Sequence, residues 1–229
     1  MNKPQILYLE DDTDLGEITA DLLSRKGFSV KWLNNGAEGL EAINNQEFDL
    51  IVADIMMPKL DGYAFLKQIR ESGSAIPFIL LSARVLTEDV LHGFSIGADD
   101  YIRKPFNLEE LIARINRLLK VPSAAPIQNE KKIIAIGSYQ YNPASYKLTH
   151  NQHSVSLSPR SGEILYRLAT NKDHFLPRKE TLLELWDDDN FFSGRSLDVF
   201  ISKLRRNLSE DPRIRIINIR ATGYRLIIE

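Results

Sequence analysis

The 229-residue chain contains no cysteine, which excludes disulfides, thiolate zinc sites and cysteine nucleophiles. It also lacks any apolar run that approaches membrane-spanning length. Near the amino terminus only Ile6 to Leu9 is apolar before acidic residues begin, so the sequence predicts no secretory signal peptide. These absences predict a soluble, cytoplasmic protein with no membrane partner.

The two halves of the chain carry opposite charge. Residues 1–120 contain 13 Lys and Arg against 19 Asp and Glu, a net charge of −6, whereas residues 121–229 contain 16 against 12, a net charge of +4. The length suffices for one large domain or two ordinary domains. An acidic half joined to a basic half indicates two domains with different partners, and the basic half suits a polyanion.

The stretch Leu50–Gly62, LIVADIMMPKLDG, is typical of a buried strand that ends in a loop. Its first four residues are apolar, which suits a strand covered on both faces. Pro58 cannot donate to a sheet ladder, so Asp54 lies where the strand ends. Ligands bind at that edge of a parallel sheet, although an aspartate there could instead hydrogen-bond its own backbone in a turn.

Strand-like apolar runs alternate with helix-period stretches throughout residues 1–120. Five such units predict an α/β fold, a (βα)5 doubly wound parallel sheet with strand order 2-1-3-4-5. The predicted strands are Ile6–Leu9, Ser29–Leu33, Leu50–Ala53, Phe78–Leu81 and Tyr101–Arg103. The predicted helices are Asp14–Arg25, Ala37–Asn44, Tyr63–Arg70, Glu88–Ser95 and Leu108–Leu119.

Polar residues follow these strands, and the topology brings them to one edge of the sheet. They are Glu10, Asp11 and Asp12 after the first strand, Asp54 after the third, Ser82 after the fourth and Lys104 after the fifth. Clustered carboxylates raise one another's pKa, and a hard divalent cation such as Mg²⁺ relieves that repulsion. The sequence therefore predicts a magnesium site that attracts a phosphoryl group, although Asp12 could instead cap the following helix.

Several short motifs occur together in the first half at consistent spacing. They are Glu10-Asp11, Asp54 with Met57-Pro58 and Asp61-Gly62, Ser82-Ala83, Gly97–Tyr101, and Lys104-Pro105-Phe106. In this combination the first 120 residues resemble the receiver domain of two-component response regulators. The resemblance implies a phosphoprotein in which Asp54 accepts a phosphoryl group from a sensor histidine kinase.

The resemblance also implies roles for the neighbouring residues. Asp11, Asp54 and the backbone carbonyl of Met56 would ligate Mg²⁺, and Glu10 would act through water. Lys104 would pair with the phosphoryl oxygens, Ser82 would hydrogen-bond one of them, and Tyr101 would swing inward as Ser82 moves. Phosphoryl transfer requires positioning and charge neutralisation, which these residues would supply.

The resemblance further implies a homodimer that forms on activation. The fourth and fifth helices would form this dimer through ion pairs. Asp100, Glu110 and Arg114 fit that pattern. Val90 and Ile96, however, stand where charged partners are usual, so we expect a dimer that is more apolar, weaker or differently arranged. Exposed apolar residues on a helix also mark interfaces in their own right.

Residues 121–132 contain two prolines and no periodicity, which predicts a linker between domains 1–120 and 133–229. After it come four short alternating segments typical of a small antiparallel sheet, then helices Pro159–Thr170 and Arg178–Trp186. His150 and His153 flank a predicted turn and are expected to be exposed there. Residues 187–192 form an acidic loop, but Phe192 stands where a calcium loop requires glycine, so calcium binding is rejected.

The third helix of this half, predicted over Arg195–Leu208, has a buried apolar stripe and a basic outer face. A hairpin, Ile214–Ile219 and Tyr224–Ile228, follows it. From residue 194 to 229 there are 8 basic and 4 acidic residues. A basic face is often merely solvated, but after two helices and before a hairpin it indicates a recognition helix with a wing.

The segments Arg195–Val199, Leu204–Arg206 and Arg220–Arg225 resemble the winged-helix effector domain of the OmpR/PhoB subfamily, an α+β winged helix-turn-helix domain. The resemblance implies binding to repeated sites in double-stranded promoter DNA, and contact of the acidic loop with RNA polymerase. The implied DNA-binding residues are Arg195, Val199, Ser202, Lys203, Arg205, Arg206, Arg220, Thr222 and Arg225. Ala221 stands where glycine is commoner, and Asp198 is expected to orient a neighbouring arginine.

Together these features predict a transcription regulator controlled by phosphorylation, and not an enzyme. One alternative is a regulator of the same architecture that binds DNA or protein without phosphorylation. A phosphatase of the haloacid-dehalogenase type is disfavoured because Met56 stands where such enzymes need a second acid. A flavodoxin-like nucleotide binder is disfavoured because the first loop of this chain is acidic, whereas a bound phosphate needs hydrogen-bond donors there.

Overall fold

The computed structural model describes residues 3–83, 87–120, 132–186 and 191–229. The chain divides into two compact units, Met1–Lys120 and Val121–Glu229, and each is considered by itself. The predicted linker lies outside the described residues except for Lys132. None of the helices in the described ranges is long and apolar enough to cross a bilayer.

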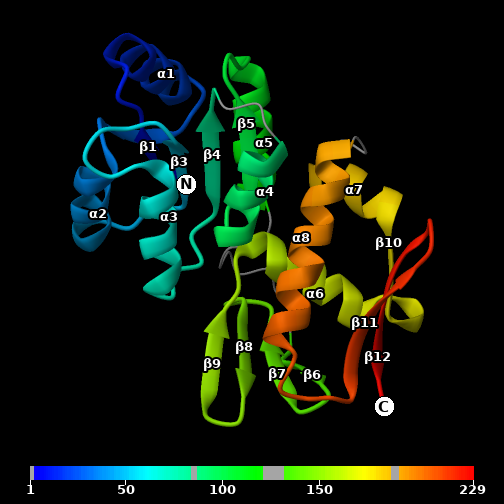
Figure 1. Ribbon diagram of the computed structural model, residues 1–229. Coiled ribbons are helices and arrows are strands. Elements are labelled where there is room, and N and C mark those ends of the chain that lie inside the picture. The colour runs from blue at the N-terminus through cyan, green and yellow to red at the C-terminus, as the bar shows by residue number, and fades with distance from the viewer. Residues whose placement is uncertain (1–2, 84–86, 121–131, 187–190) are drawn as a thin grey trace. The chain divides into compact units, whose positions relative to one another are not determined.

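The first unit is a five-stranded parallel sheet of order β2-β1-β3-β4-β5, which confirms the predicted α/β fold (Figure 1). Its strands are β1 (Gln5–Leu9), β2 (Ser29–Leu33), β3 (Leu50–Asp54), β4 (Phe78–Ser82) and β5 (Asp100–Arg103). Its helices are α1 (Thr13–Arg25), α2 (Gly36–Asn45), α3 (Gly62–Glu71), α4 (Thr87–Ile96) and α5 (Leu108–Lys120). All ten elements begin and end within one residue of the predicted bounds, because each is marked by an apolar run or periodicity.

The strand register brings the polar strand ends to one edge of this sheet. Asp54 lies opposite Leu81, and Ser82 lies opposite Arg103, so β3, β4 and β5 end side by side. Every residue of β3 and β4 is buried, as expected for strands covered by helices on both faces. The buried strands therefore supply a rigid base for the residues that follow them.

Two acidic residues near this edge serve as helix caps. The Asp12 carboxylate accepts a hydrogen bond of 3.0 Å from the Leu15 N–H at the start of α1, which confirms the alternative reading of Asp12. Asp61 caps α3 in the same way, through a 2.7 Å bond from the Ala64 N–H. At Gly62 a Cβ would lie 2.3 Å from the Asp54 carbonyl oxygen, so only glycine lets α3 start this close to β3.

The second unit contains two antiparallel sheets and three α-helices in its described part. Strands β6 (Ile134–Ile136), β7 (Tyr139–Asn142), β8 (Lys147–His150) and β9 (His153–Ser156) form one sheet, and β10 (Phe175–Pro177), β12 (Gly223–Ile228) and β11 (Ile214–Ile219) form the other. The helices are α6 (Pro159–Thr170), α7 (Arg178–Trp186), α8 (Phe191–Asn207) and the short 3₁₀ helix η1 (Lys172–His174). This arrangement confirms the predicted winged-helix architecture.

Three details differ from the predictions. The α8 helix begins at Phe191, four residues before the predicted start at Arg195, because Gly194 does not interrupt it. Residues 187–190 of the predicted acidic loop lie outside the described residues. The three-residue strand β10 and η1 were not predicted. His150 is not simply exposed: it stacks on Tyr139 with ring centroids 4.5 Å apart and contacts Glu210 at 2.7 Å.

The predicted apolar stripe of α8 forms the core of the second unit. Leu197, Phe200, Ile201, Leu204 and Leu208 are all buried. At the amino terminus of α6, Ser158 caps the helix and Pro159 occupies its first turn, as predicted. Burial of this stripe fixes which side of α8 faces away from the core, and that side carries the basic residues.

Candidate functional site

Three carboxylates meet at the carboxyl edge of the parallel sheet. Glu10, Asp11 and Asp54 each offer an oxygen within 4.8 Å of the others, the one such cluster of potential metal ligands among the described residues. Glu10 and Asp54 are buried, whereas Asp11 is exposed. Because two of the acids follow β1 and the third ends β3, the cluster depends on the pairing of those two strands.

Lys104, which follows β5, reaches into this cluster. Its Nζ donates to the two Glu10 oxygens at 2.8 and 2.6 Å, and it also donates to Asp54. Burial alone would lower the pKa of Lys104, but the hydrogen bonds to Asp54 and Glu10 outweigh it and raise that pKa. Burial raises the pKa of Glu10, against the opposing effect of Lys104. The site thus pairs clustered acids with one compact positive charge.

The donor set of the cluster fits Mg²⁺. Carboxylate oxygens are the hard ligands that Mg²⁺ prefers, and the exposed Asp11 leaves one side open to the waters that the ion retains. Asp54 is further fixed by a 3.1 Å hydrogen bond from the Met56 N–H, and the Tyr8 hydroxyl donates to Glu10 at 3.2 Å. The Met56 carbonyl as a metal ligand stays a prediction.

The two predicted switch residues lie together beside this edge. Ser82 is fully buried, and Tyr101 is buried with 8% of its surface exposed. Burial raises the pKa of Tyr101, while a side-chain hydrogen bond with Ser82 lowers it. Tyr101 is therefore already turned inward in this structure, in contact with the residue predicted to draw it there.

The residues predicted for the dimer face are partly buried and partly paired with one another within one chain. Arg114 binds Asp100 at 2.8 Å and Glu110 at 2.8 Å within one chain. Val90 is 4% exposed, so it is a core residue of the monomer and not an exposed apolar side chain on the helix; the expectation for Val90 was wrong. Ile96 is partly exposed. The positions of Val90 and Ile96 were taken from the resemblance, which does not show which residues of α4 this core covers.

In the second unit the predicted DNA-binding residues lie on the outer side of α8 and on the hairpin of β11 and β12. Val199 and Lys203 are partly exposed, and the exposed members are Arg195, Ser202, Arg205, Arg206, Arg220, Thr222 and Arg225. Arg205 also donates to the Ile216 carbonyl at 2.8 Å, so it braces α8 against β11. Their role in DNA binding stays a prediction.

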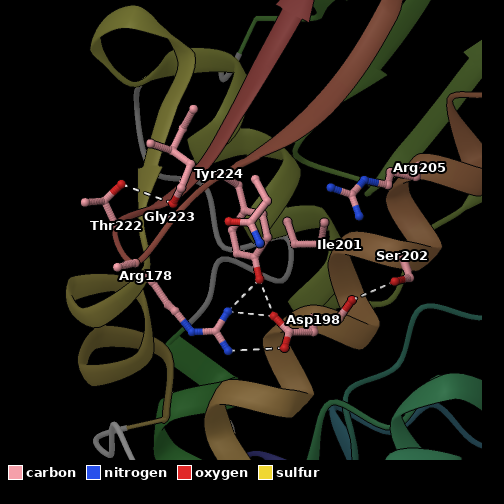
Figure 2. A pocket seen from close by; sticks show the side chains of 11 residues that line it. Arg178, Asp198, Ile201, Ser202, Arg205, Thr222, Gly223 and Tyr224 are labelled. Carbon is pink, nitrogen blue, oxygen red and sulfur yellow. Dashed lines mark hydrogen bonds and ion pairs between the residues drawn. The ribbon is translucent and has the colours of Figure 1, made fainter.

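A hydrogen-bonded network of three residues connects α7, α8 and β12 at this surface (Figure 2). Arg178, from the start of α7, binds the Asp198 carboxylate at 2.6 and 3.2 Å, and the Tyr224 hydroxyl donates to the same carboxylate. Arg178 also donates to the Gly194 carbonyl at 2.7 Å. Burial raises the pKa of Tyr224 to about 12, with Asp198 adding to the effect. Asp198 thus pairs with an arginine, as predicted, but with one from another helix.

A cavity of about 390 Å³ lies between α8 and the hairpin, and the three residues of this network form part of its lining (Figure 2). Its lining combines Ser202 and Arg205 of α8 with Asn218 and Thr222 of the hairpin.

The sequence interpretation missed Arg178, whose partners lie 20 and 46 residues further along the chain. Asp198, an acid on the basic face of α8, was the signal in the sequence that a basic partner such as Arg178 exists.

The turn of the hairpin contains Ala221, with a φ of 62°. This left-handed conformation costs an L-residue about 1 kcal/mol, a cost that glycine does not carry. We expect Ala221→Gly to raise the free energy of unfolding of the second unit by roughly 0.5–1 kcal/mol, since the greater freedom of glycine in the unfolded chain offsets part of the gain. Urea unfolding of the full chain measures this change.

Ala135→Gly is the matched control for Ala221→Gly. Ala135 is exposed in β6, so a glycine there gains nothing and weakens the strand. A loss of stability in Ala221→Gly equal to that in Ala135→Gly would contradict the strain assigned to the hairpin turn.

Comparisons with known proteins cover both units. Residues 6–116 match the response regulator receiver domain, and residues 151–226 match the carboxyl-terminal domain of transcriptional regulatory proteins. Transcriptional regulatory protein RprY of Bacteroides fragilis is 39% identical over 98% of this chain and 95% of its own length. Response regulator MprA of Mycobacterium leprae is 35% identical over 96% of both chains. The solved structure of DrrB, an OmpR/PhoB homologue of Thermotoga maritima, is 29% identical, covers 98% of this chain and 99% of its own, and has a TM-score of 0.52.

Proposed function

The chain belongs to the response regulators that join a receiver domain to a DNA-binding transcriptional regulatory domain, and from this premise we propose that phosphorylation of Asp54 controls its binding to specific promoter sequences. The observation that carries the proposal is the convergence of Glu10, Asp11, Asp54 and Lys104 at one edge of the sheet. A histidine kinase supplies the phosphoryl group in this family, and we propose the same donor here.

The chemistry follows from the contacts of Asp54. An Asp54 carboxylate oxygen attacks phosphorus, and the bond from phosphorus to the histidine nitrogen of the kinase breaks as the new P–O bond forms. Glu10, Asp11 and Asp54 would hold Mg²⁺, which would supply positive charge to balance that of the phosphoryl oxygens. Lys104, which holds Asp54 and Glu10 before transfer, is placed to pair with the oxygens of the acyl phosphate afterwards.

The new charge then acts on the residues beside it. Ser82 is buried at the end of the neighbouring strand and is drawn towards the phosphoryl oxygens, and its partner Tyr101 is held inward. We propose that this shift favours a homodimer of receiver domains, so that two linked effector domains bind a DNA repeat with avidity. In this proposal the regulator works in the cytoplasm, where it contacts RNA polymerase at promoters.

A DNA-binding measurement tests this function. Duplexes selected from a random library by the full chain serve as probes, and fluorescence anisotropy gives their affinity before and after treatment with acetyl phosphate and Mg²⁺. We expect treatment to raise the affinity roughly tenfold or more through dimerisation. Omission of Mg²⁺ is the control and should leave the affinity at the untreated value.

One observation favours a second candidate, a regulator of the same architecture that does not depend on phosphorylation. Tyr101 is buried and hydrogen-bonds Ser82, which is the inward placement that the proposed switch assigns to the active state. Equal DNA affinity with and without acetyl phosphate would support this candidate.

We further propose that the protein is not a phosphatase. An enzyme with an aspartyl-phosphate intermediate needs an acid to protonate the leaving group, and the residue two positions after Asp54 is the exposed Met56. Turnover of a phosphate ester that disappears in Asp54→Asn would overturn this part of the proposal.

A further inference from the structure

We infer that Tyr63, at the start of α3, is a positioning residue that holds Tyr101 inward before Asp54 is phosphorylated, and so sets the basal output of the switch. The inference rests on the proposed function in one respect, because Tyr101 is taken as the residue that passes the state of Asp54 to the outer helices. Tyr63 itself follows Gly62 and is separate from the acid cluster.

Tyr63 is fixed by contacts with α4. Its hydroxyl donates to the main-chain carbonyl of Asp89 at 2.9 Å. Its ring and the His92 ring make a T-shaped contact, with ring centroids 4.8 Å apart and an interplanar angle of 83°. One hydrogen bond and one edge-on aromatic contact therefore hold the Tyr63 ring in a single place against this helix.

Tyr63 and Tyr101 share the same position of α4. A Cβ at Gly93 would lie 3.6 Å from a carbon of the Tyr63 ring and 3.6 Å from a carbon of the Tyr101 ring. The two rings thus lie side by side against a helix position that has no side chain. Tyr101 forms a side-chain hydrogen bond with Ser82 and a second, weaker one with Tyr63.

This geometry gives Tyr101 two partners that respond differently to phosphorylation. Ser82 lies at the end of β4 beside the phosphoryl site, so its position changes with the state of Asp54. Tyr63 is anchored to α3 and α4, so its contact with Tyr101 is available in both states. Without the Tyr63 hydroxyl, Tyr101 keeps only its hydrogen bond with Ser82, so the inward position loses about one net hydrogen bond and Tyr101 shifts towards solvent.

The test uses the full chain labelled with 3-fluorotyrosine and followed by fluorine NMR without any phosphoryl donor. The Tyr101 resonance is identified by its disappearance in Tyr101→Phe. In Tyr63→Phe we expect the ratio of inward to outward Tyr101 to fall roughly fivefold, the equivalent of one net hydrogen bond, and the resonance to become more sensitive to exchange of H2O for D2O. Beryllofluoride with Mg²⁺, which mimics the phosphoryl group, should restore the inward signal.

Tyr166→Phe, which removes a tyrosine hydroxyl from the other unit, is the matched control and should leave the Tyr101 resonance unchanged. If Tyr63→Phe lowers the unfolding midpoint in urea but does not move this resonance, Tyr63 is only structural and the inference is overturned. Intact mass after acetyl phosphate treatment separates the two proposals. A wild-type chain that gains no phosphoryl group refutes the proposed function, whereas the fluorine comparison still decides the role of Tyr63.

Discussion

Treatment with acetyl phosphate and Mg²⁺ is expected to add one phosphoryl group to the wild-type chain, and Asp54→Asn is expected to abolish this gain completely. The amide has almost the same shape as the carboxylate but offers no anionic oxygen to attack phosphorus. The fold should persist, because Lys104 keeps its two hydrogen bonds to Glu10. Intact mass spectrometry measures the result, and chelation of Mg²⁺ should stop the wild-type reaction as well.

Asp12→Asn supplies the matched control for this experiment. Asp12 belongs to the same acidic run, but its carboxylate caps α1, and asparagine is an equally good cap. We therefore expect Asp12→Asn to gain the phosphoryl group at the wild-type level. Continued incorporation in Asp54→Asn would place the acceptor elsewhere in the cluster.

The second large effect concerns α8. Simultaneous replacement of Lys203 and Arg206 by alanine should weaken DNA binding by a factor of ten or more at low salt, as roughly estimated for two lost contacts of this kind. It should also reduce the slope of log affinity against log salt concentration by about 2, because each lost phosphate contact releases about one counterion fewer. Anisotropy with selected duplexes at several salt concentrations measures both quantities.

Lys147→Ala is the control for charge alone. Lys147 is exposed in β8, on the other sheet of the same unit. Its removal lowers the net charge without touching α8 or the hairpin, so the slope should stay at the wild-type value. An unchanged slope in the double variant would show that the outer side of α8 does not face the phosphates.

Local signals were enough to predict most of the parallel sheet and its acidic edge. Leu50 to Ala53 are apolar without interruption, and Pro58 ends the strand, so the position of Asp54 followed from the chain itself. The strand order then placed Glu10 and Lys104 beside it, and the structure shows those contacts. Winged-helix features with a strong local pattern, such as Ser158-Pro159 and the stripe of α8, were predicted for the same reason.

The remaining features depend on contacts between distant residues. Arg178 pairs with Asp198 and Tyr224 through tertiary structure, and no local pattern reveals such pairs. The strand β10 has three residues and ends in Pro177, too short for any periodicity to appear. Val90 was expected on the exposed side of α4 because the resemblance places charged residues there, but in this chain the position is buried in the core of the unit.

The network of Arg178, Asp198 and Tyr224 has a consequence for the engineering of DNA preference. Because its three members come from α7, α8 and β12, α8 is not an exchangeable module. A chimaera that imports α8 from a relative keeps its orientation only if the graft carries an acid at position 198 to meet Arg178. Swaps that move the whole second unit avoid this constraint, since every member of the network travels together.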